Sequence, residues 1–151
     1  KSIKPPLISV PSRKAILFAL VSLQAIETAC FRGSSFSNTA SNNDSTVSGG
    51  FINTASGNTS TISGGYKNIA GGICSFIGGG GCNVASSNGS TVSGGFCNTA
   101  SGSNSTVSGG CRNTTSGQWS TISGGRLNTA SSTYSTVSGG VSNYATGPNS
   151  T

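Results

Sequence analysis

The sequence predicts an all-β protein: a parallel β-solenoid, or β-roll, of fifteen-residue coils that covers residues 32–151. Each coil contains two related halves, which read approximately NTASG and STVSGG. An asparagine also returns at every fifteenth position: Asn38, Asn53, Asn68, Asn83, Asn98, Asn113, Asn128 and Asn143. Self-similarity at a short fixed period is typical of stacked-coil architectures. We therefore expect each coil to stack on the next in register.

A third observation distinguishes the solenoid from a flexible linker. With 24 glycines in 151 residues, the composition alone would fit a disordered glycine/serine linker. A linker has no reason to keep a branched apolar residue in strict register, whereas a strand places alternate side chains on opposite faces. We therefore expect one residue of each second half to fill the coil interior: Val47, Ile62, Ile77, Val92, Val107, Ile122 and Val137.

Residues 1–31 are predicted to form an extended basic arm followed by a hydrophobic helix. Prolines at positions 5, 6 and 11 favour extended backbone, and the apolar run from Ala15 to Phe31 favours a helix of about four turns. This segment is interpreted as a trimer nucleus or as the anchor to a base, capsid or membrane protein. A retained secretory signal or a membrane anchor is the alternative for residues 14–31.

Within the repeats, short strands are predicted at Asn38–Ser41 and Ser45–Ser48 and at the equivalent positions of every later coil. Paired glycines such as Gly49 and Gly50 follow each second strand, and they indicate a sharp corner that needs a positive φ or a close backbone approach. The last repeat half stops at Thr151, so we expect the repeats to continue in a longer protein.

The interior of such a coil is expected to be too small to stabilise a single chain. One branched residue and one alanine per turn bury little apolar area, against an ordering cost of about 1–2 kcal/mol per residue. Aromatic residues that recur in one exposed column are typical of an interface, with loosely packed corner aromatics as the alternative. We therefore expect a chain-to-chain seam two residues before each asparagine, at Phe36, Phe51, Tyr66 and Phe96.

The repeats resemble the head modules of YadA-type trimeric autotransporter adhesins and the related β-roll repeats of phage and large-virus tail-fibre proteins. The resemblance rests on NTASG and STVSGG recurring as paired short strands, as in residues 98–102 and 105–110. It covers about three quarters of the chain. In that family three parallel chains pack into one rod, so the resemblance implies a homotrimeric fibre shaft.

Composition argues against an enzyme. The chain has no histidine, one aspartate and one glutamate, which removes most acid–base, catalytic-triad and carboxylate-metal chemistry. No CxxC motif occurs, so we expect no zinc site and no other cofactor. The net charge of +6 is concentrated at the N-terminal end rather than on an aromatic-studded face, which argues against nucleic-acid binding.

The five cysteines leave the redox state open. Cys82 and Cys97 occupy the same repeat position one coil apart, where stacked strands lie about 4.8 Å from each other. This spacing is within the Cα range of a disulfide. A staple between coils is one interpretation, and reduced cysteines that act as small packing residues are the other. Cys111 falls one column earlier, in a position suited to reaching another chain.

Two further functions are suggested by the surface. Trp119 and Tyr134 lie one coil apart in the same turn column and are the candidate glycan contact of an adhesin. A column of threonines, each followed two residues later by serine, resembles the ladders of ice-binding β-solenoids, although Phe76 interrupts it: Thr46, Thr61, Thr91, Thr106, Thr121 and Thr136. Six Asn-X-Ser/Thr triplets would accept glycans in a eukaryotic secretory route, although the repeat itself generates them.

These observations predict a non-enzymatic structural fibre protein, extracellular and located on the surface of a virion or a cell. Its stiff, weakly charged shaft would self-associate as a homotrimer or a higher fibre and support attachment to a host surface receptor or glycan. A glycan- or surface-binding adhesin domain is the alternative, and an ice-binding β-solenoid is the second alternative.

Overall fold

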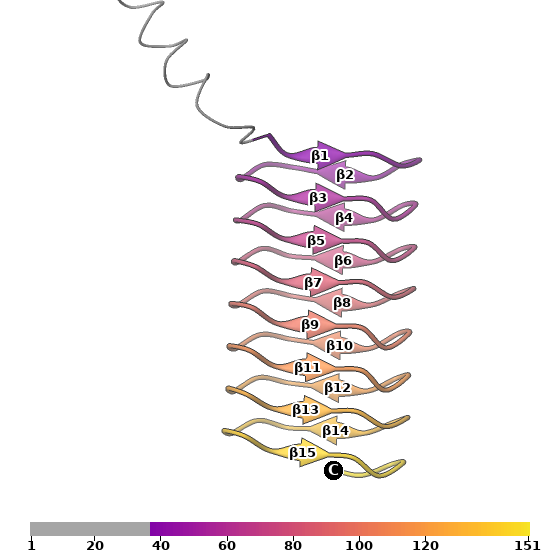
Figure 1. Ribbon diagram of the computed structural model, residues 1–151, viewed down its shortest axis with the longest axis vertical. Coiled ribbons are helices and arrows are strands. Elements are labelled where there is room, and N and C mark those ends of the chain that lie inside the picture. The colour runs from indigo at the N-terminus through magenta and orange to yellow at the C-terminus, as the bar shows by residue number, and fades with distance from the viewer. Residues whose placement is uncertain (1–36) are drawn as a thin grey trace, which may run out of the picture. The chain divides into compact units, whose positions relative to one another are not determined.

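The computed structural model describes residues 37–151, which form a parallel β-solenoid (Figure 1). The all-β fold class and the fifteen-residue coil are therefore confirmed. Each full coil contributes two strands of two residues, and the strands are β1 (Thr39–Ala40), β2 (Thr46–Val47), β3 (Thr54–Ala55), β4 (Thr61–Ile62), β5 (Ile69–Ala70), β6 (Phe76–Ile77), β7 (Val84–Ala85), β8 (Thr91–Val92), β9 (Thr99–Ala100), β10 (Thr106–Val107), β11 (Thr114–Thr115), β12 (Thr121–Ile122), β13 (Thr129–Ala130), β14 (Thr136–Val137) and β15 (Tyr144–Ala145). The predicted arm and helix at residues 1–31 lie outside the described residues. Residues 37–151 contain no helix that could cross a bilayer.

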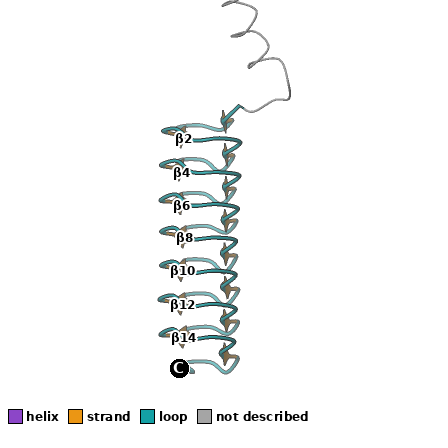
Figure 2. Cartoon of the chain, turned by 90° about the vertical axis from the view of Figure 1, so that its left-hand side faces the viewer, coloured by secondary structure: helices purple, strands orange, loops and turns teal. Residues whose placement is uncertain are grey.

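The strands stack into two sheets on opposite sides of the coil. The eight odd-numbered strands form one sheet and the seven even-numbered strands form the other, with parallel neighbours in each. Each residue pairs with its equivalent fifteen positions along the chain, so that Thr99 lies opposite Thr114. The odd-numbered arrows point one way and the even-numbered arrows the other in Figure 1, and Figure 2 shows the sheets as two separate columns.

The regular strands are shorter than the four residues predicted, because the ladder hydrogen bonds end at the turn that follows. The N–H groups of Ser101 and Gly102 both donate to the carbonyl of Thr115, at 2.8 and 3.2 Å, which ends the alternating ladder. A third line of parallel bridges, which the sequence analysis did not predict, joins the coils at one corner and runs through Phe51, Tyr66, Gly81, Phe96, Cys111, Arg126 and Val141.

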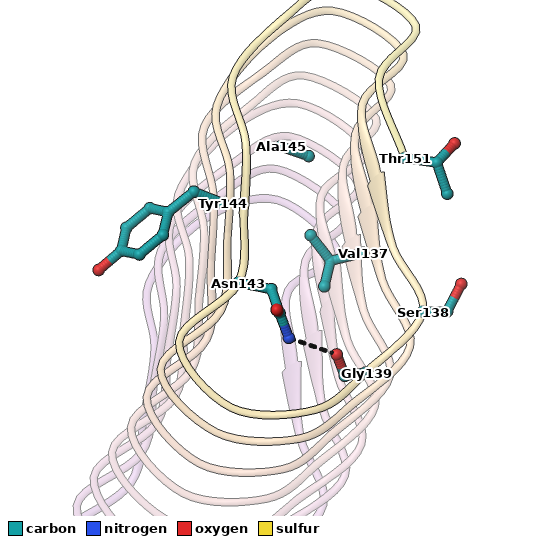
Figure 3. Close-up of a pocket in the computed structure, with 7 residues that line it drawn as sticks. All are labelled: Val137, Ser138, Gly139, Asn143, Tyr144, Ala145 and Thr151. Atoms are coloured by element: carbon teal, nitrogen blue, oxygen red, sulfur yellow. Dashed lines mark hydrogen bonds between the residues drawn. The ribbon is translucent and has the colours of Figure 1, made fainter.

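The second residue of nearly every strand points into the coil, because strand side chains alternate between faces. The branched interior column consists of Ile62, Ile77, Val92, Val107 and Ile122, which are fully buried, Val137, which is 5% exposed, and Val47 in the first described coil, which is partly buried. Alanine fills most of the facing column. Figure 3 shows this cross-section at the last coil, where Val137 and Ala145 point inward and Tyr144 points outward.

A ladder of buried asparagine amides runs along the solenoid beside this apolar column. The Asn98 backbone N–H donates to the Asn83 Oδ1 at 3.0 Å, and the Asn98 Oδ1 in turn accepts from the Asn113 N–H at 3.0 Å. The Asn98 Nδ2 donates to the carbonyls of Gly94 and Gly110, each at 3.0 Å. Each internal amide thus joins three coils and satisfies backbone groups at the glycine corner.

Serine lines the interior at the other end of the second strand. Ser60, Ser90 and Ser105 are fully buried, and the Ser90 Oγ donates to the Ser87 carbonyl at 2.6 Å. In the alanine column, the buried Thr115 hydroxyl donates to the Ser105 Oγ at 3.0 Å. The hydroxyls of the buried Ser60 and Ser75 have no hydrogen-bond partner. The interior is therefore apolar in its centre, with asparagine at one end and serine at the other, a richer composition than the one valine and one alanine expected from sequence.

The corner after each even-numbered strand requires glycine at its second position. Gly110 has a φ of 87°, and a Cβ there would lie 2.1 Å from the Gly125 oxygen and 2.7 Å from the Asn113 Nδ2. The preceding Gly109 has no atom within 4 Å of its Cβ position. The stacking of the coils therefore requires glycine at the second position of the pair and not at the first.

We expect Gly110→Ala to lower the free energy of unfolding by about 3 kcal/mol or more, because the new methyl group collides with the backbone of the next coil. Gly109→Ala is the matched control and should be neutral, or stabilising by about 0.4–1 kcal/mol through a lower entropy of the unfolded chain. Urea unfolding followed by circular dichroism measures both. Equal destabilisation by the two substitutions would contradict the stacking geometry.

We expect Asn98→Ala to lower the free energy of unfolding by about 3–5 kcal/mol. The substitution removes three side-chain hydrogen bonds and leaves their backbone partners unsatisfied. Asn143 lies in the last coil and is exposed, so Asn143→Ala should cost only about 1–2 kcal/mol. The same unfolding measurement compares the two. An Asn98→Ala protein as stable as the unmodified chain would show that the amide ladder is dispensable.

Candidate functional site

The corner that carries the third ladder gathers exposed aromatic side chains, and we call it the aromatic corner (the third-ladder residues and the residue after each). The rings of Phe51 and Tyr66 stack with centroids 6.1 Å apart and an interplanar angle of 19°. The Lys67 Nζ lies 5.3 Å from the Tyr66 centroid, within the range of a cation–π contact. The exposed fractions of Phe51, Tyr66 and Phe96 are 41%, 43% and 52%, so much of each of these residues is accessible.

Gly81 interrupts this aromatic column between Tyr66 and Phe96. A Cβ on Gly81 would lie 3.0 Å from the Phe96 Cδ2, so the Phe96 ring lies across the glycine backbone. The backbone of the corner continues through the gap, because the Phe96 N–H donates to the Gly110 carbonyl at 2.9 Å. The predicted seam residues Phe51, Tyr66 and Phe96 thus share one corner, and Phe36 lies outside the described residues.

Three thiols lie at the same corner, on successive coils. Cys82 and Cys97 have φ values of 56° and 55° and occupy the same left-handed position, whereas Cys111 belongs to the third ladder. All three are half-buried free thiols. Burial raises the pKa of the Cys97 thiol, and so do the charge and hydrogen bond of Cys82, whereas the guanidinium of Arg112 lowers it.

The opposite corner of the coil carries the two aromatic residues considered for glycan contact. Trp119 and Tyr134 are 48% and 58% exposed and lie at equivalent positions of successive coils. Their backbones are left-handed, with φ values of 59° and 57°. The Trp119 N–H donates to the Ser103 carbonyl at 2.9 Å, and the Tyr134 N–H donates to the Gln118 carbonyl at 3.0 Å. The stacking backbone therefore holds both residues in this unusual conformation.

The coil formed by residues 68–82 differs from its neighbours, because its outward positions are apolar. Ile69, Ile73 and Phe76 are 38–49% exposed at sites where threonine, asparagine or serine stands in most coils. Phe76 interrupts the threonine column considered for ice binding, and the threonines around it are half-buried except in the first coil: Thr46, Thr61, Thr91, Thr106, Thr121 and Thr136. The interruption at Phe76 follows from the sequence, whereas the exposure of Ile69 and Ile73 beside it is seen in the structure.

The glycosylation triplets divide into two kinds. Asn113 belongs to the amide ladder and is fully buried, with its Nδ2 donating to the carbonyls of Gly109 and Gly125 at 2.9 Å. Such a side chain has no access to a glycosylating enzyme. The asparagines of the other five triplets are exposed turn residues: Asn43, Asn58, Asn88, Asn104 and Asn149.

The last coil forms a hollow lined by the inward-pointing Val137, Asn143 and Ala145 together with Ser138, Gly139, Tyr144 and Thr151 (Figure 3). Val137 and Ala145 form its apolar wall, and the Asn143 Nδ2 donates to the Gly139 carbonyl at 2.9 Å. These groups are the ordinary interior of a coil seen from its end, and they offer no acid–base pair. Within residues 37–151, no group of three or more metal-binding side chains comes together. The exposed corners, rather than a pocket, are therefore the candidate functional surfaces.

Three segments match the family model of the ubiquitous surface protein adhesin repeat: residues 45–57, 60–72 and 90–102. Each segment contains one even-numbered strand, the following corner and the next odd-numbered strand. They include the corners that carry Phe51, Tyr66 and Phe96. A comparison with curated proteins found no match. The resemblance of the repeats to those of trimeric autotransporter adhesins is thus confirmed at three segments of a chain that folds as a parallel β-solenoid.

Proposed function

We propose that this chain is a structural, non-enzymatic segment of a cell-surface fibre, in which parallel copies associate along the aromatic corner as a homotrimer. The observation that carries the proposal is the line of exposed rings at Phe51, Tyr66 and Phe96, inside the segments that match the adhesin repeat. A row of exposed apolar side chains on a solvent-accessible protein surface usually marks an interaction site. A cell surface is favoured over a virion because the matched repeat is that of a surface adhesin.

The backbone supports a mechanical role. Two sheets, the third ladder and the asparagine amides connect every coil to the next, so bending the rod would break several hydrogen bonds at once. The residues between Lys67 and Arg112 include no charged side chain. Parallel copies would therefore approach without electrostatic repulsion along this stretch, which includes Phe96, whereas Lys67, Arg112 and Arg126 place positive charge on the rest of the same corner. We propose that residues 1–31 connect such a shaft to its base and that the shaft holds an attachment element away from it.

We expect light scattering of the purified chain to give the mass of a trimer, and the combined variant Phe51→Ser, Tyr66→Ser and Phe96→Ser to give that of a monomer. The substitutions remove the apolar rings but leave the interior columns unchanged. They also remove one ring stack within the chain, which contributes about 0.5–1.5 kcal/mol, so circular dichroism must confirm that the variant is folded.

The matched control removes similarly exposed aromatic residues from outside the aromatic corner. The combined variant Trp119→Ser, Tyr134→Ser and Tyr144→Ser should keep the trimer mass, because these side chains lie at the opposite corner or on the odd-numbered sheet. A monomeric unmodified chain would refute the proposal. Dissociation of the control variant would move the interface away from the aromatic corner.

A direct glycan contact at Trp119 and Tyr134 is a second candidate, and the backbone provides a specific reason for it. A left-handed conformation costs a bulky residue about 1–2 kcal/mol, whereas glycine, asparagine and aspartate adopt it more readily. The same column holds Asp44, Gly89, Asn104 and Asn149, together with Thr59 and Cys74. The turn does not require an aromatic residue, so the two exposed rings on successive coils favour a contact role.

We expect Trp119→Asn and Tyr134→Asn to leave the unfolding midpoint unchanged or raised, because asparagine suits the left-handed backbone at both positions. If the rings contact sugars, the same variants should lose binding to immobilised host glycans by at least about tenfold, a typical consequence of removing an aromatic contact. Surface plasmon resonance against a glycan panel measures this. Unchanged binding by the folded variants would exclude this second function.

A further inference from the structure

We propose that Cys82 and Cys97 form an intrachain disulfide that joins two adjacent coils at the aromatic corner. This is a modification site on the solenoid, at the corner along which we propose that copies of the chain associate. In the structure both residues are half-buried free thiols on consecutive coils.

The backbone holds the two residues in register. The Cys97 N–H donates to the Gly81 carbonyl, and the Cys82 N–H donates to the Tyr66 carbonyl, each at 2.8 Å. Gly81 and Phe96, the residues just before the cysteines, are parallel bridge partners. Stacked residues of this kind have Cα atoms about 4.8 Å apart, inside the 4.4–6.8 Å range of disulfides. The φ values agree within one degree, so the two residues have the same backbone conformation. Stacking in register would leave their Cβ atoms about 4.8 Å apart, so the coils must approach slightly at this corner to reach the roughly 3.5–4.5 Å of a disulfide.

The other described cysteines lack such a partner. Cys74 occupies the opposite corner, where its Sγ lies 3.0 Å from the Thr59 Oγ1, and its column neighbours are Thr59 and Gly89. Cys111 is flanked in the third ladder by Phe96 and Arg126. Among residues 37–151, Cys82 and Cys97 are thus the two cysteines stacked directly on one another in a single column.

The position also has a structural reason. Residues 78–81 are four consecutive glycines, and they occupy the corner immediately before Cys82. In most other coils the corresponding segment is serine, two glycines and a larger residue. Glycine loses more conformational entropy on folding than any other residue, so this corner is costly to order. A covalent link across it would offset part of that cost by restricting the unfolded chain.

The reaction is thiol–disulfide exchange with a small-molecule or protein disulfide as the oxidant. One cysteine thiolate attacks a sulfur of that disulfide, forms a mixed disulfide and releases one thiolate. The second cysteine then attacks its neighbour's sulfur and releases the other thiolate. Two thiols of the chain are oxidised, the external disulfide is reduced to two thiols, and the two cysteine protons pass to the released thiolates or to water. The partial exposure of both residues in the single chain gives the oxidant access before copies associate.

The test uses the full chain equilibrated with oxidised glutathione, blocked with iodoacetamide and unfolded before digestion. Cleavage by chymotrypsin after Phe76, Phe96 and Trp119 yields one peptide with Cys82, residues 77–96, and one with Cys97 and Cys111, residues 97–119. We expect mass spectrometry to find these peptides joined. The joined product should persist in Cys111→Ser and disappear in Cys97→Ser, while Cys74 remains alkylated.

Stability provides an independent readout. We expect oxidation to raise the thermal midpoint of the unmodified chain by about 5–10 °C, and to leave the variant Cys82→Ser, Cys97→Ser unchanged. Serine fits this column, because Ser142 stands in it with a φ of 57°. Because the pKa of the Cys97 thiol is raised, less of it is thiolate at neutral pH, and oxidation should accelerate as the pH becomes alkaline.

Three outcomes would overturn the inference. The first is that both thiols remain open to alkylation after equilibration with oxidised glutathione. The second is a link from Cys82 to Cys111, detected as a joined product that survives Cys97→Ser but not Cys111→Ser. The third is a link between chains, detected as a dimer band on a non-reducing gel. Because the first result is read on the unmodified chain, the inference can be tested even if a variant folds poorly.

Discussion

The structure depends on one constraint: in both sheets and in the third ladder, each residue lies in register with its equivalent one repeat away along the chain. Thr99 lies on Thr114, Phe96 on Cys111, and Asn98 on Asn113. A residue whose backbone bonds to the neighbouring coil, as the Thr99 N–H does to the Asn113 carbonyl, cannot change its backbone conformation in one coil alone. The asparagine column strengthens this constraint, because the Asn98 side chain binds two glycine carbonyls and the Asn113 N–H, and the Asn98 N–H donates to the Asn83 Oδ1.

The same constraint decides where function can lie. Interior columns must fit one another, so they hold apolar residues, serine and asparagine, with little freedom to vary. Outward columns carry no such restriction, and there the chain changes from coil to coil: Phe96, Cys111 and Arg126 follow one another in a single ladder. Side chains that interact with other molecules are therefore expected at the corners and on the outer faces, as separate residues on a uniform frame.

The fold and its interior could be predicted because both follow from the period. Val107 and Ile122 stand fifteen residues apart, and strand alternation places them inside whatever the details of the turn. The role of Asn98 could not be predicted, because asparagine next to glycine is equally typical of an exposed turn. The packing of the Phe96 ring across Gly81 could not be predicted either, because it depends on how two coils stack rather than on either sequence segment alone. The sequence shows which residues occupy equivalent positions in successive coils, whereas the structure shows what those residues contact.

The amide ladder also changes the physical argument for association. From sequence, association was expected because an interior of one branched residue and one alanine per coil buries too little apolar area. The structure adds buried hydrogen bonds in every internal coil, including those of Asn98 and Thr115, which contribute about 0.5–1.5 kcal/mol each. The case for association therefore shifts from the interior to the surface. The case now depends on the rings of Phe51, Tyr66 and Phe96. Exposing these rings to water is unfavourable, and the packing of the interior columns does not require it, so a partner surface is the better explanation.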